Sequence, residues 1–208
     1  MHKLERPSPA PSTLSQTRHL SNNWEHPKWS ADHKKPIMDA LCEMQANRCA
    51  YCEGVLEKNT GHIEHFKKRS LFPELTFCWD NLFYSCLSEE HCGKKKDKVI
   101  KTQENNLKLI DPCKENPEHF LVFSYDGVIA PRTNLSHEAS LRANFTISAL
   151  NLNEPKLVQQ RKNILRQYEW LMQYSTEEID DYLTTDVIKG LPYITAIYHY
   201  FGKRFVSY

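Results

Sequence analysis

Two close pairs of cysteines constrain the fold of this chain more than any other feature. Cys49 and Cys52 form the first pair, as Cys-Ala-Tyr-Cys, and Cys86 and Cys92 form the second. Four thiolates in two close pairs can close a tetrahedral zinc site, which ties together segments that are distant in sequence. The second spacing is wider than the usual two to four residues. Four ordinary buried thiols therefore remain the alternative to a structural Zn²⁺ site.

Cysteine usage and the N-terminal sequence bear on the cellular compartment. The chain has seven cysteines, and its first residues, Met1–Gln16, are rich in proline and serine without the apolar core of a secretory signal. Metal binding then fits better than disulfides. The other three cysteines, Cys42, Cys78 and Cys113, are expected to be buried free thiols. No apolar run approaches the ~18 residues of a membrane span, so a cytoplasmic location without membrane contact is expected.

A His-Ile-Glu-His run lies between the two cysteine pairs, within Gly61–Phe66. The carboxylate of Glu64 is an oxygen ligand that suits a hard divalent cation. The imidazole of His65, with an unperturbed pKa of ~6.5, can accept a proton from water near neutral pH. These parts suit hydrolysis of a phosphodiester, in which the cation stabilises a phosphoryl oxygen and the leaving 3′ oxygen. A surface strand with polar side chains is the alternative.

Basic side chains flank the same run on both sides. The net charge of +1 argues neither for nor against nucleic acid, but a local basic surface can bind phosphates. A solvated helix face is the alternative. The candidate nucleic-acid-binding residues are Lys67, Lys68, Arg69, Lys94, Lys95 and Lys96.

Hydrophobic periodicity and turn signals predict the secondary structure. In the first half they predict a helix over 36–44 with Pro36 in its first turn, a hairpin over 55–64 that turns at 58–61, a short helix or turn over 79–84, and a helix over 94–102. In the second half, Asp126-Gly127 between two apolar runs predicts a hairpin. Helices are expected from His137 onward, over 152–172, 177–188 and 193–201.

The order of the motifs resembles that of a known enzyme family. Cys-x-Tyr-Cys, Glu-His-Phe, Trp-x-Asn-Leu and a final Cys-Gly-x-x-Lys-Asp follow one another along the chain. This pattern resembles the HNH (ββα-metal) endonucleases that carry a zinc-binding cysteine quartet. More narrowly, it resembles the PtuB-type HNH effector of Septu anti-phage systems and of a retron type. Thr146–Asn153, followed by Arg161, is also similar, and the resemblance covers roughly residues 24–165.

The resemblance implies roles for individual residues. His65 matches the general base, and Glu64 matches the acidic metal ligand, where most relatives have Asp. Asn81 matches the middle Asn of the family name, which orients the base and its loop. Lys96 matches a family lysine that is expected to contact phosphate.

One position departs from the family pattern. The final residue of the HNH motif is usually Asn or His, and Gly93 stands there instead. Glycine has no side chain to act as a ligand. His91 is the first substitute as a partner of Glu64 on the catalytic ion, and Asp97 is the second.

The resemblance also implies a fold, cofactors and partners. The expected fold is α+β: an irregular arm over 1–35, a zinc-stapled HNH nuclease domain over 36–110, and a hairpin with a mostly helical docking region over 111–208. The expected ions are a structural Zn²⁺ and a catalytic Mg²⁺ or Mn²⁺. The expected partners are an ABC-type or SMC-like ATPase, a reverse transcriptase with its RNA–DNA product in retrons, and a DNA or RNA substrate.

Two other functions remain compatible with the sequence. One is a zinc-knuckle module that binds nucleic acid without cleaving it, because Gly93 replaced a ligand. The other is an assembly subunit. Divalent-metal-dependent cleavage that disappears in His65→Ala would separate the nuclease from both.

Overall fold

The computed structural model describes residues 1–17, 22–57, 60–184 and 190–202. The fold is α+β, with two separate two-stranded antiparallel sheets among helices. The first half contains a 3-10 helix η1 (Ser12–Gln16), α1 (Ala31–Met44), β1 (Gly61–His65), η3 (Pro73–Leu75), η4 (Trp79–Asn81), β2 (Leu82–Cys86), α2 (Cys92–Val99) and α3 (Gln103–Leu107). The second half contains η5 (Pro117–His119), β3 (Leu121–Phe123), β4 (Ile129–Pro131), α4 (His137–Ala149), α5 (Pro155–Gln167), η6 (Glu169–Gln173), α6 (Thr176–Leu183) and α8 (Ile194–Phe201).

The first sheet pairs β1 with β2 and carries the His-Ile-Glu-His run. Gly61 lies opposite Cys86, and His65 lies opposite Leu82. The predicted hairpin over 55–64 is therefore wrong: Val55 forms only an isolated bridge, with Arg48. Residues 58–59 of the predicted turn lie outside the described residues. The strand partner instead comes from beyond the loop over 66–81, directly after the short helix η4.

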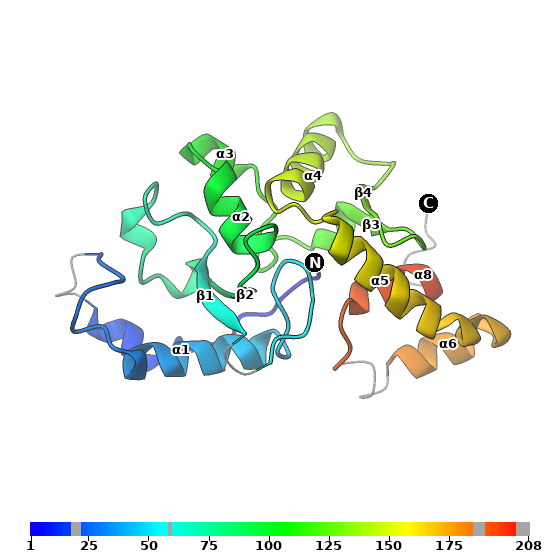
Figure 1. Ribbon diagram of the computed structural model, residues 1–208, viewed down its shortest axis with the longest axis horizontal. Helices are drawn as coiled ribbons and strands as arrows, with labels where there is room; N and C mark the ends of the chain where they lie inside the picture. The colour runs from blue at the N-terminus through cyan, green and yellow to red at the C-terminus, as the bar shows by residue number, and fades with distance from the viewer. Residues whose placement is uncertain (18–21, 58–59, 185–189, 203–208) are drawn as a thin grey trace.

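Helices cover this sheet on two sides, with α1 packed against both strands and α2 packed against β2 (Figure 1). The first turn of α1 is not at Pro36: the helix begins at Ala31 and continues through the proline. Proline inside a helix removes one backbone hydrogen bond, and the fully buried Ile37 and Leu41 provide packing that offsets this loss. Helix α2 begins two residues before the predicted start, at Cys92, whose N–H donates to the carbonyl of Leu150.

The second sheet confirms the hairpin that Asp126-Gly127 predicts. Leu121 pairs with Pro131, and Phe123 pairs with Ile129. Gly127 has a φ of +85° in the turn, a conformation that glycine adopts at little cost. The hairpin packs against α4 and α8, as Figure 1 shows on the side of the C-terminal helices.

The C-terminal helices follow the prediction in part. The segment over 152–172 is divided into α5 and the 3-10 helix η6. In the segment over 177–188, α6 ends at Leu183, and residues 185–188 lie outside the described residues. Helix α8 agrees with the predicted segment over 193–201 within one residue.

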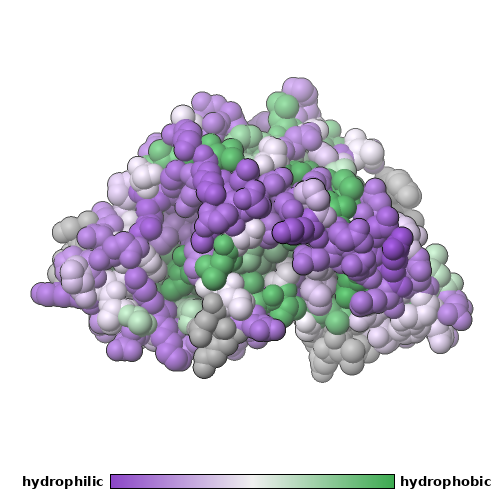
Figure 2. Space-filling model, viewed as in Figure 1, coloured by the Kyte–Doolittle hydropathy of each residue, from purple (hydrophilic) through white to green (hydrophobic). Residues whose placement is uncertain are grey.

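One continuous apolar core joins the two halves of the protein. It includes Trp24 and Trp29 of the N-terminal arm, which pack onto the body of the protein. Hydrophilic side chains cover most of the face in Figure 2. Among the described residues, no helix combines the length and apolarity needed to cross a membrane.

Candidate active site and zinc centre

The four paired cysteines converge on one point. Their Sγ atoms all lie within 4.8 Å of one another, and none of the four is in a disulfide. A tetrahedral ZnS₄ centre with Zn–S bonds of about 2.3 Å has sulfur atoms about 3.8 Å apart. The cluster therefore fits a four-coordinate zinc ion. In the described part of the chain, it is the only group of three or more His, Cys, Asp or Glu side chains arranged in this way.

His91 lies beside this cluster. Its Nδ1 lies 3.2 Å from Sγ of Cys92 and 3.6 Å from Sγ of Cys86. An imidazole N–H directed at thiolates stabilises their negative charge. This contact opposes the prediction that His91 completes the metal site at Glu64. His91 is the extended residue before α2, and its ring is directed at the cysteines.

His65, the last residue of β1, is buried with only 6% of its surface exposed. Its Nε2 lies 2.9 Å from the carbonyl oxygen of Thr76, so Nε2–H donates and Nδ1 is left as the acceptor. The ring also meets Trp24 edge to face, at 4.7 Å between centroids. Burial lowers the pKa of His65 to about 4, and the imidazole is neutral at physiological pH.

Asn81 closes the loop that contains Thr76. Its Oδ1 accepts from the N–H of Lys67 at 2.7 Å, and its Nδ2 donates to the carbonyls of Lys67 and Leu75 at 3.0 and 3.1 Å. Its backbone carbonyl accepts from the N–H of Phe66. One buried amide thus holds both ends of the segment that orients His65.

Glu64 precedes His65 in β1, with 3% of its surface exposed. Oε1 forms an ion pair with Nζ of Lys96 at 2.8 Å, and Oε2 lies 3.2 Å from Nε2 of His62. Burial alone would raise the pKa of this carboxyl group. Lys96 and His62 outweigh the burial and lower the pKa to about 2, which keeps Glu64 ionised.

Lys96 is an internal residue, contrary to the prediction that it contacts phosphate. Its side chain is 0% exposed. Nζ donates to the carbonyls of His65 and Phe66 at 2.8 and 3.2 Å and to Oδ1 of Asp97 at 2.7 Å. A fully buried ammonium cannot reach a substrate, and Asp97 is engaged at this ammonium. Nothing in the Lys94-Lys95-Lys96 run distinguishes the buried lysine from its neighbours.

Gly93 and His62 complete the surroundings of the carboxylate. A Cβ atom added at Gly93 would lie 2.5 Å from both Cδ and Oε2 of Glu64. The glycine at the position of the missing ligand therefore permits α2 to approach Glu64. His62, the first residue of the His-Ile-Glu-His run and expected to have a supporting role, is the imidazole in contact with Glu64. The two-residue spacing of His62 and Glu64 predicts this contact, because it places both side chains on one face of a strand.

The first basic cluster is partly occupied by internal contacts. Lys68 donates to the carbonyls of Asp97 and Ile100 at the end of α2. Arg69 forms an exposed ion pair with Glu25 of the arm at 3.3 Å. Lys67, half-buried, lies over the ring of Phe72 at 5.4 Å.

The second cluster remains near the surface of α2. Lys94 forms an ion pair with Glu89 at 2.7 Å, and Lys95 is half-buried. With Lys96 inside the protein, five of the six candidate basic residues lie at least partly on the surface. Their binding to nucleic acid stays a prediction.

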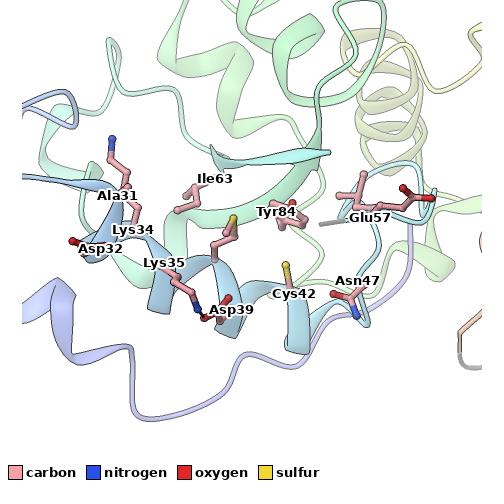
Figure 3. Close-up of a pocket in the computed structure, with 12 residues that line it drawn as sticks. Ala31, Asp32, Lys34, Lys35, Asp39, Cys42, Asn47, Glu57, Ile63 and Tyr84 are labelled. Carbon is pink, nitrogen blue, oxygen red and sulfur yellow. Dashed lines mark hydrogen bonds and ion pairs between the residues drawn. The ribbon is translucent and has the colours of Figure 1, made fainter. Parts of the chain in front are cut away.

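A cavity of about 820 Å³ opens on the opposite face of the sheet, between α1 and the loop before β1 (Figure 3). Ile63 and Tyr84 line it together with Met38 and Cys42, and lysine and aspartate side chains of α1 form its rim. Ile63 alternates with His62 and Glu64 along the strand. The cavity is therefore separate from the Glu64 site.

Curated proteins resemble this chain over most of its length, although no family model matches it. "Retron Vc95 putative HNH endonuclease" of Vibrio cholerae serotype O1 biovar El Tor is 28% identical over 164 residues, which are 76% of each chain. "Septu protein PtuB" of Bacillus thuringiensis is 27% identical over 74% of this chain and 55% of that protein. "Septu protein PtuB" of Bacillus mycoides (strain KBAB4) is 24% identical over 64% of this chain and 52% of that protein.

The chain resembles PtuB-type HNH endonucleases. It spans about half the length of the two PtuB proteins that it matches. The names of these relatives support a nuclease at the level of the family, and the cysteine cluster fits a metal ion.

Proposed function

We propose that this protein is a divalent-metal-dependent HNH endonuclease that hydrolyses phosphodiester bonds in nucleic acid. The observation that carries the proposal is the orientation of His65. Its Nε2–H is fixed on the carbonyl of Thr76, so that Nδ1 is the acceptor of a neutral imidazole. The ionised carboxylate of Glu64, the preceding residue, adds a ligand for a cation.

The chemistry follows from these two side chains. Nδ1 of His65 takes a proton from water, the water oxygen attacks phosphorus, and the bond to the 3′ oxygen breaks. The leaving 3′ oxygen then gains a proton from solvent. Glu64 would hold a divalent cation, which would supply positive charge to stabilise the negative charge that develops in this reaction. Asn81 keeps the loop of Thr76 in place and so keeps His65 oriented.

The test is metal-dependent cleavage by the zinc-loaded protein. Duplex DNA, single-stranded DNA and RNA are incubated with Mg²⁺ or Mn²⁺, and His65→Ala is compared with the exposed His137→Ala. Cleavage is expected to disappear only in His65→Ala, which should retain zinc and a cooperative unfolding transition, at a lower melting temperature because a buried imidazole is lost. If the wild-type protein binds nucleic acid without cleaving it, the inactive zinc-knuckle module replaces the nuclease.

The proposal extends to the cellular role. By analogy with its Septu and retron relatives, the chain acts in anti-phage defence with an ABC-type or SMC-like ATPase, and with a reverse transcriptase and its RNA–DNA product if the system is a retron. The C-terminal region offers a docking surface, because Trp170, Met172 and Tyr174 around η6 are 40%, 63% and 50% exposed. Apolar side chains exposed together are typical of protein interfaces.

The docking surface can be tested by substitution. Met172→Asp with Tyr174→Asp is expected to abolish co-purification with the proposed ABC-type or SMC-like ATPase partner and to preserve cleavage by the isolated protein. Leu107→Asp, at an equally exposed leucine of α3, is the matched control. Retention of the ATPase by the double variant would contradict this assignment.

A further inference from the structure

We propose that His62 and Glu64, two residues of one strand, together hold the catalytic divalent cation, and that position 93 contributes no ligand. The inference rests on the proposed nuclease function and deepens it, because it names the ligands of the metal. It replaces both substitutes that the sequence suggested, His91 and Asp97.

The two donor atoms already lie at the spacing of neighbouring ligands. Nε2 of His62 and Oε2 of Glu64 are 3.2 Å apart on the same face of β1. Adjacent ligands of an octahedral ion with bonds of about 2.1–2.2 Å are separated by about 3 Å. A cation can therefore bind between these atoms with little change in either side chain.

Each oxygen of the carboxylate has a separate role. Oε1 forms the ion pair with the buried Lys96, which anchors the carboxylate and leaves Oε2 directed at His62. The other ring nitrogen of His62, Nδ1, has no hydrogen-bond partner among the described residues. Glu64 is thus the group that orients the ring.

The alternative ligands are directed elsewhere. Nδ1 of His91 faces the sulfur atoms of Cys86 and Cys92, and Oδ1 of Asp97 lies 2.7 Å from the ammonium of Lys96. At position 93, the space next to Cα is filled by the carboxylate of Glu64, since a Cβ would lie 2.5 Å from Oε2. His62 is the imidazole that remains at the carboxylate.

The ligand set predicts which metal is bound. Imidazole suits transition metals, whereas Mg²⁺ prefers oxygen ligands and keeps much of its water. The side chain of His62 is 26% exposed and that of Glu64 is 4% exposed, so the site opens to solvent beside the imidazole. We expect Mn²⁺ to bind at least tenfold more tightly than Mg²⁺, with water or phosphate oxygens in the remaining positions.

Metal binding, measured without substrate, tests the inference. Zinc-loaded protein is titrated with Mn²⁺, and free Mn²⁺ is followed by its electron paramagnetic resonance signal. His62→Ala is expected to raise the Kd for Mn²⁺ at least tenfold, and the exposed His137→Ala is expected to leave it unchanged. His62→Asp retains a donor atom and is expected to shift the preference toward Mg²⁺. Zinc content and melting temperature show that each variant is folded.

The outcomes separate this inference from the proposed function. If His62→Ala binds and uses Mn²⁺ as the wild type does, the inference is wrong and the nuclease proposal stands. An unchanged metal preference in His62→Asp would also overturn the inference. If the wild type neither binds Mn²⁺ nor cleaves nucleic acid, both proposals are wrong.

Discussion

The two antiparallel strand pairs of this protein, β1–β2 (the first hairpin, with the long loop over 66–81) and β3–β4 (the second hairpin), are stabilised in the same way but differ in their proposed roles. In each, a fully buried cation from a helix holds backbone carbonyls at the end of the hairpin. Lys96 of α2 donates to the carbonyls of His65, the last residue of β1, and of Phe66, which follows it. Arg161 of α5 donates to Gly127, in the turn between β3 and β4, and to Leu152, both at 2.6 Å.

The partners of the two cations differ. Lys96 also contacts the carboxylates of Glu64 and Asp97. Arg161 instead donates to backbone carbonyls and to the amide oxygen of Asn153. Lys96 therefore connects the backbone to the candidate metal ligand Glu64, whereas Arg161 connects only structural groups. Substitutions in the first hairpin should alter both stability and cleavage, and substitutions in the second should alter stability alone.

Loss of the zinc site should give the largest difference between the hairpins. Zinc binding contributes about 10–16 kcal/mol in small zinc domains, which exceeds the total stability of most domains. Cys49→Ala is expected to lose zinc and to lose amide protection in β1–β2, while protection in β3–β4 partly remains. Metal analysis and hydrogen exchange measure both effects.

Cys113→Ala is the control, since this half-buried thiol lies outside the cluster. It should retain zinc and lose no more than about 1 kcal/mol of unfolding free energy. Unchanged zinc content in Cys49→Ala would contradict the four-cysteine site.

Removal of each buried cation compares the hairpins directly. Lys96→Met leaves the carboxylate of Glu64 buried without its ammonium, which should cost about 3–5 kcal/mol. Arg161→Met leaves the carbonyls of Gly127 and Leu152 without donors, at about 1–3 kcal/mol each. Urea unfolding is expected to show a loss in both variants.

Cleavage by the protein that remains folded then distinguishes the two. Lys96→Met should lose it, because Oε1 of Glu64 is no longer anchored, and Arg161→Met should keep the wild-type rate. Equal loss of cleavage in the two variants would remove the distinction between the hairpins.

The two hairpins also differ in how well the sequence predicts them. The β3–β4 hairpin is local, so Asp126-Gly127 between apolar runs is sufficient. The partner of β1 lies beyond the loop over 66–81, which Asn81 closes through hydrogen bonds that leave no periodic pattern. The apolar run at Leu82–Cys86 is compatible with a strand or a helix.

The candidate site shows the same division. Cysteine spacing predicts the four-cysteine cluster, because each pair needs only a local turn to present two thiolates. The burial of Lys96 depends on Glu64 and the carbonyls after β1, far away in sequence, and it could not be predicted from a run of lysines. The contact of Gly93 with Glu64 depends likewise on how α2 packs against the sheet.

Alanine substitutions at two glycines, Gly127 of the second hairpin and Gly93 beside the first, allow the same comparison with smaller expected losses of stability. At Gly127 a Cβ would lie 2.3 Å from the backbone oxygen of Val158 in α5, and φ is +85°. Because backbone cannot move aside cheaply, Gly127→Ala should cost about 2–4 kcal/mol. At Gly93 a Cβ meets the carboxyl group of Glu64, a side chain and not backbone. If Oε2 shifts while Oε1 keeps its ion pair with Lys96, Gly93→Ala should cost less than about 2 kcal/mol.

The order is expected to reverse for function. Gly93→Ala should weaken Mn²⁺ binding and cleavage, since it displaces Oε2 of Glu64, while Gly127→Ala should leave both unchanged in the folded protein. Calorimetry and a cleavage assay on the same preparations provide the measurements. Full activity in Gly93→Ala would show that the position of Glu64 at α2 is not required.

Buried histidines complete the comparison and give the smallest effect. His199 accepts a hydrogen bond at Nδ1 from the N–H of Phe123 in β3, at 3.2 Å, as a neutral imidazole. Burial lowers the pKa of His199 to about 3. The unfolded chain, with a pKa of ~6.5, binds a proton first as the pH falls, so the stabilising contribution is complete above pH ~6.5 and is lost between there and pH ~3. The slope is about 1.4 kcal/mol per pH unit.

His199→Phe should therefore flatten the dependence of the unfolding free energy on pH by about 1 kcal/mol between pH 6.5 and 5.5, where the unfolded histidine goes from half to almost fully protonated. The variant also leaves the N–H of Phe123 without its acceptor, which lowers stability equally at both pH values and does not affect the slope. Urea unfolding at the two pH values measures it, and His137→Gln accounts for the loss of one imidazole as such. An unchanged slope in His199→Phe would contradict the claim that burial of His199 as a neutral imidazole makes the stability of the protein depend on pH.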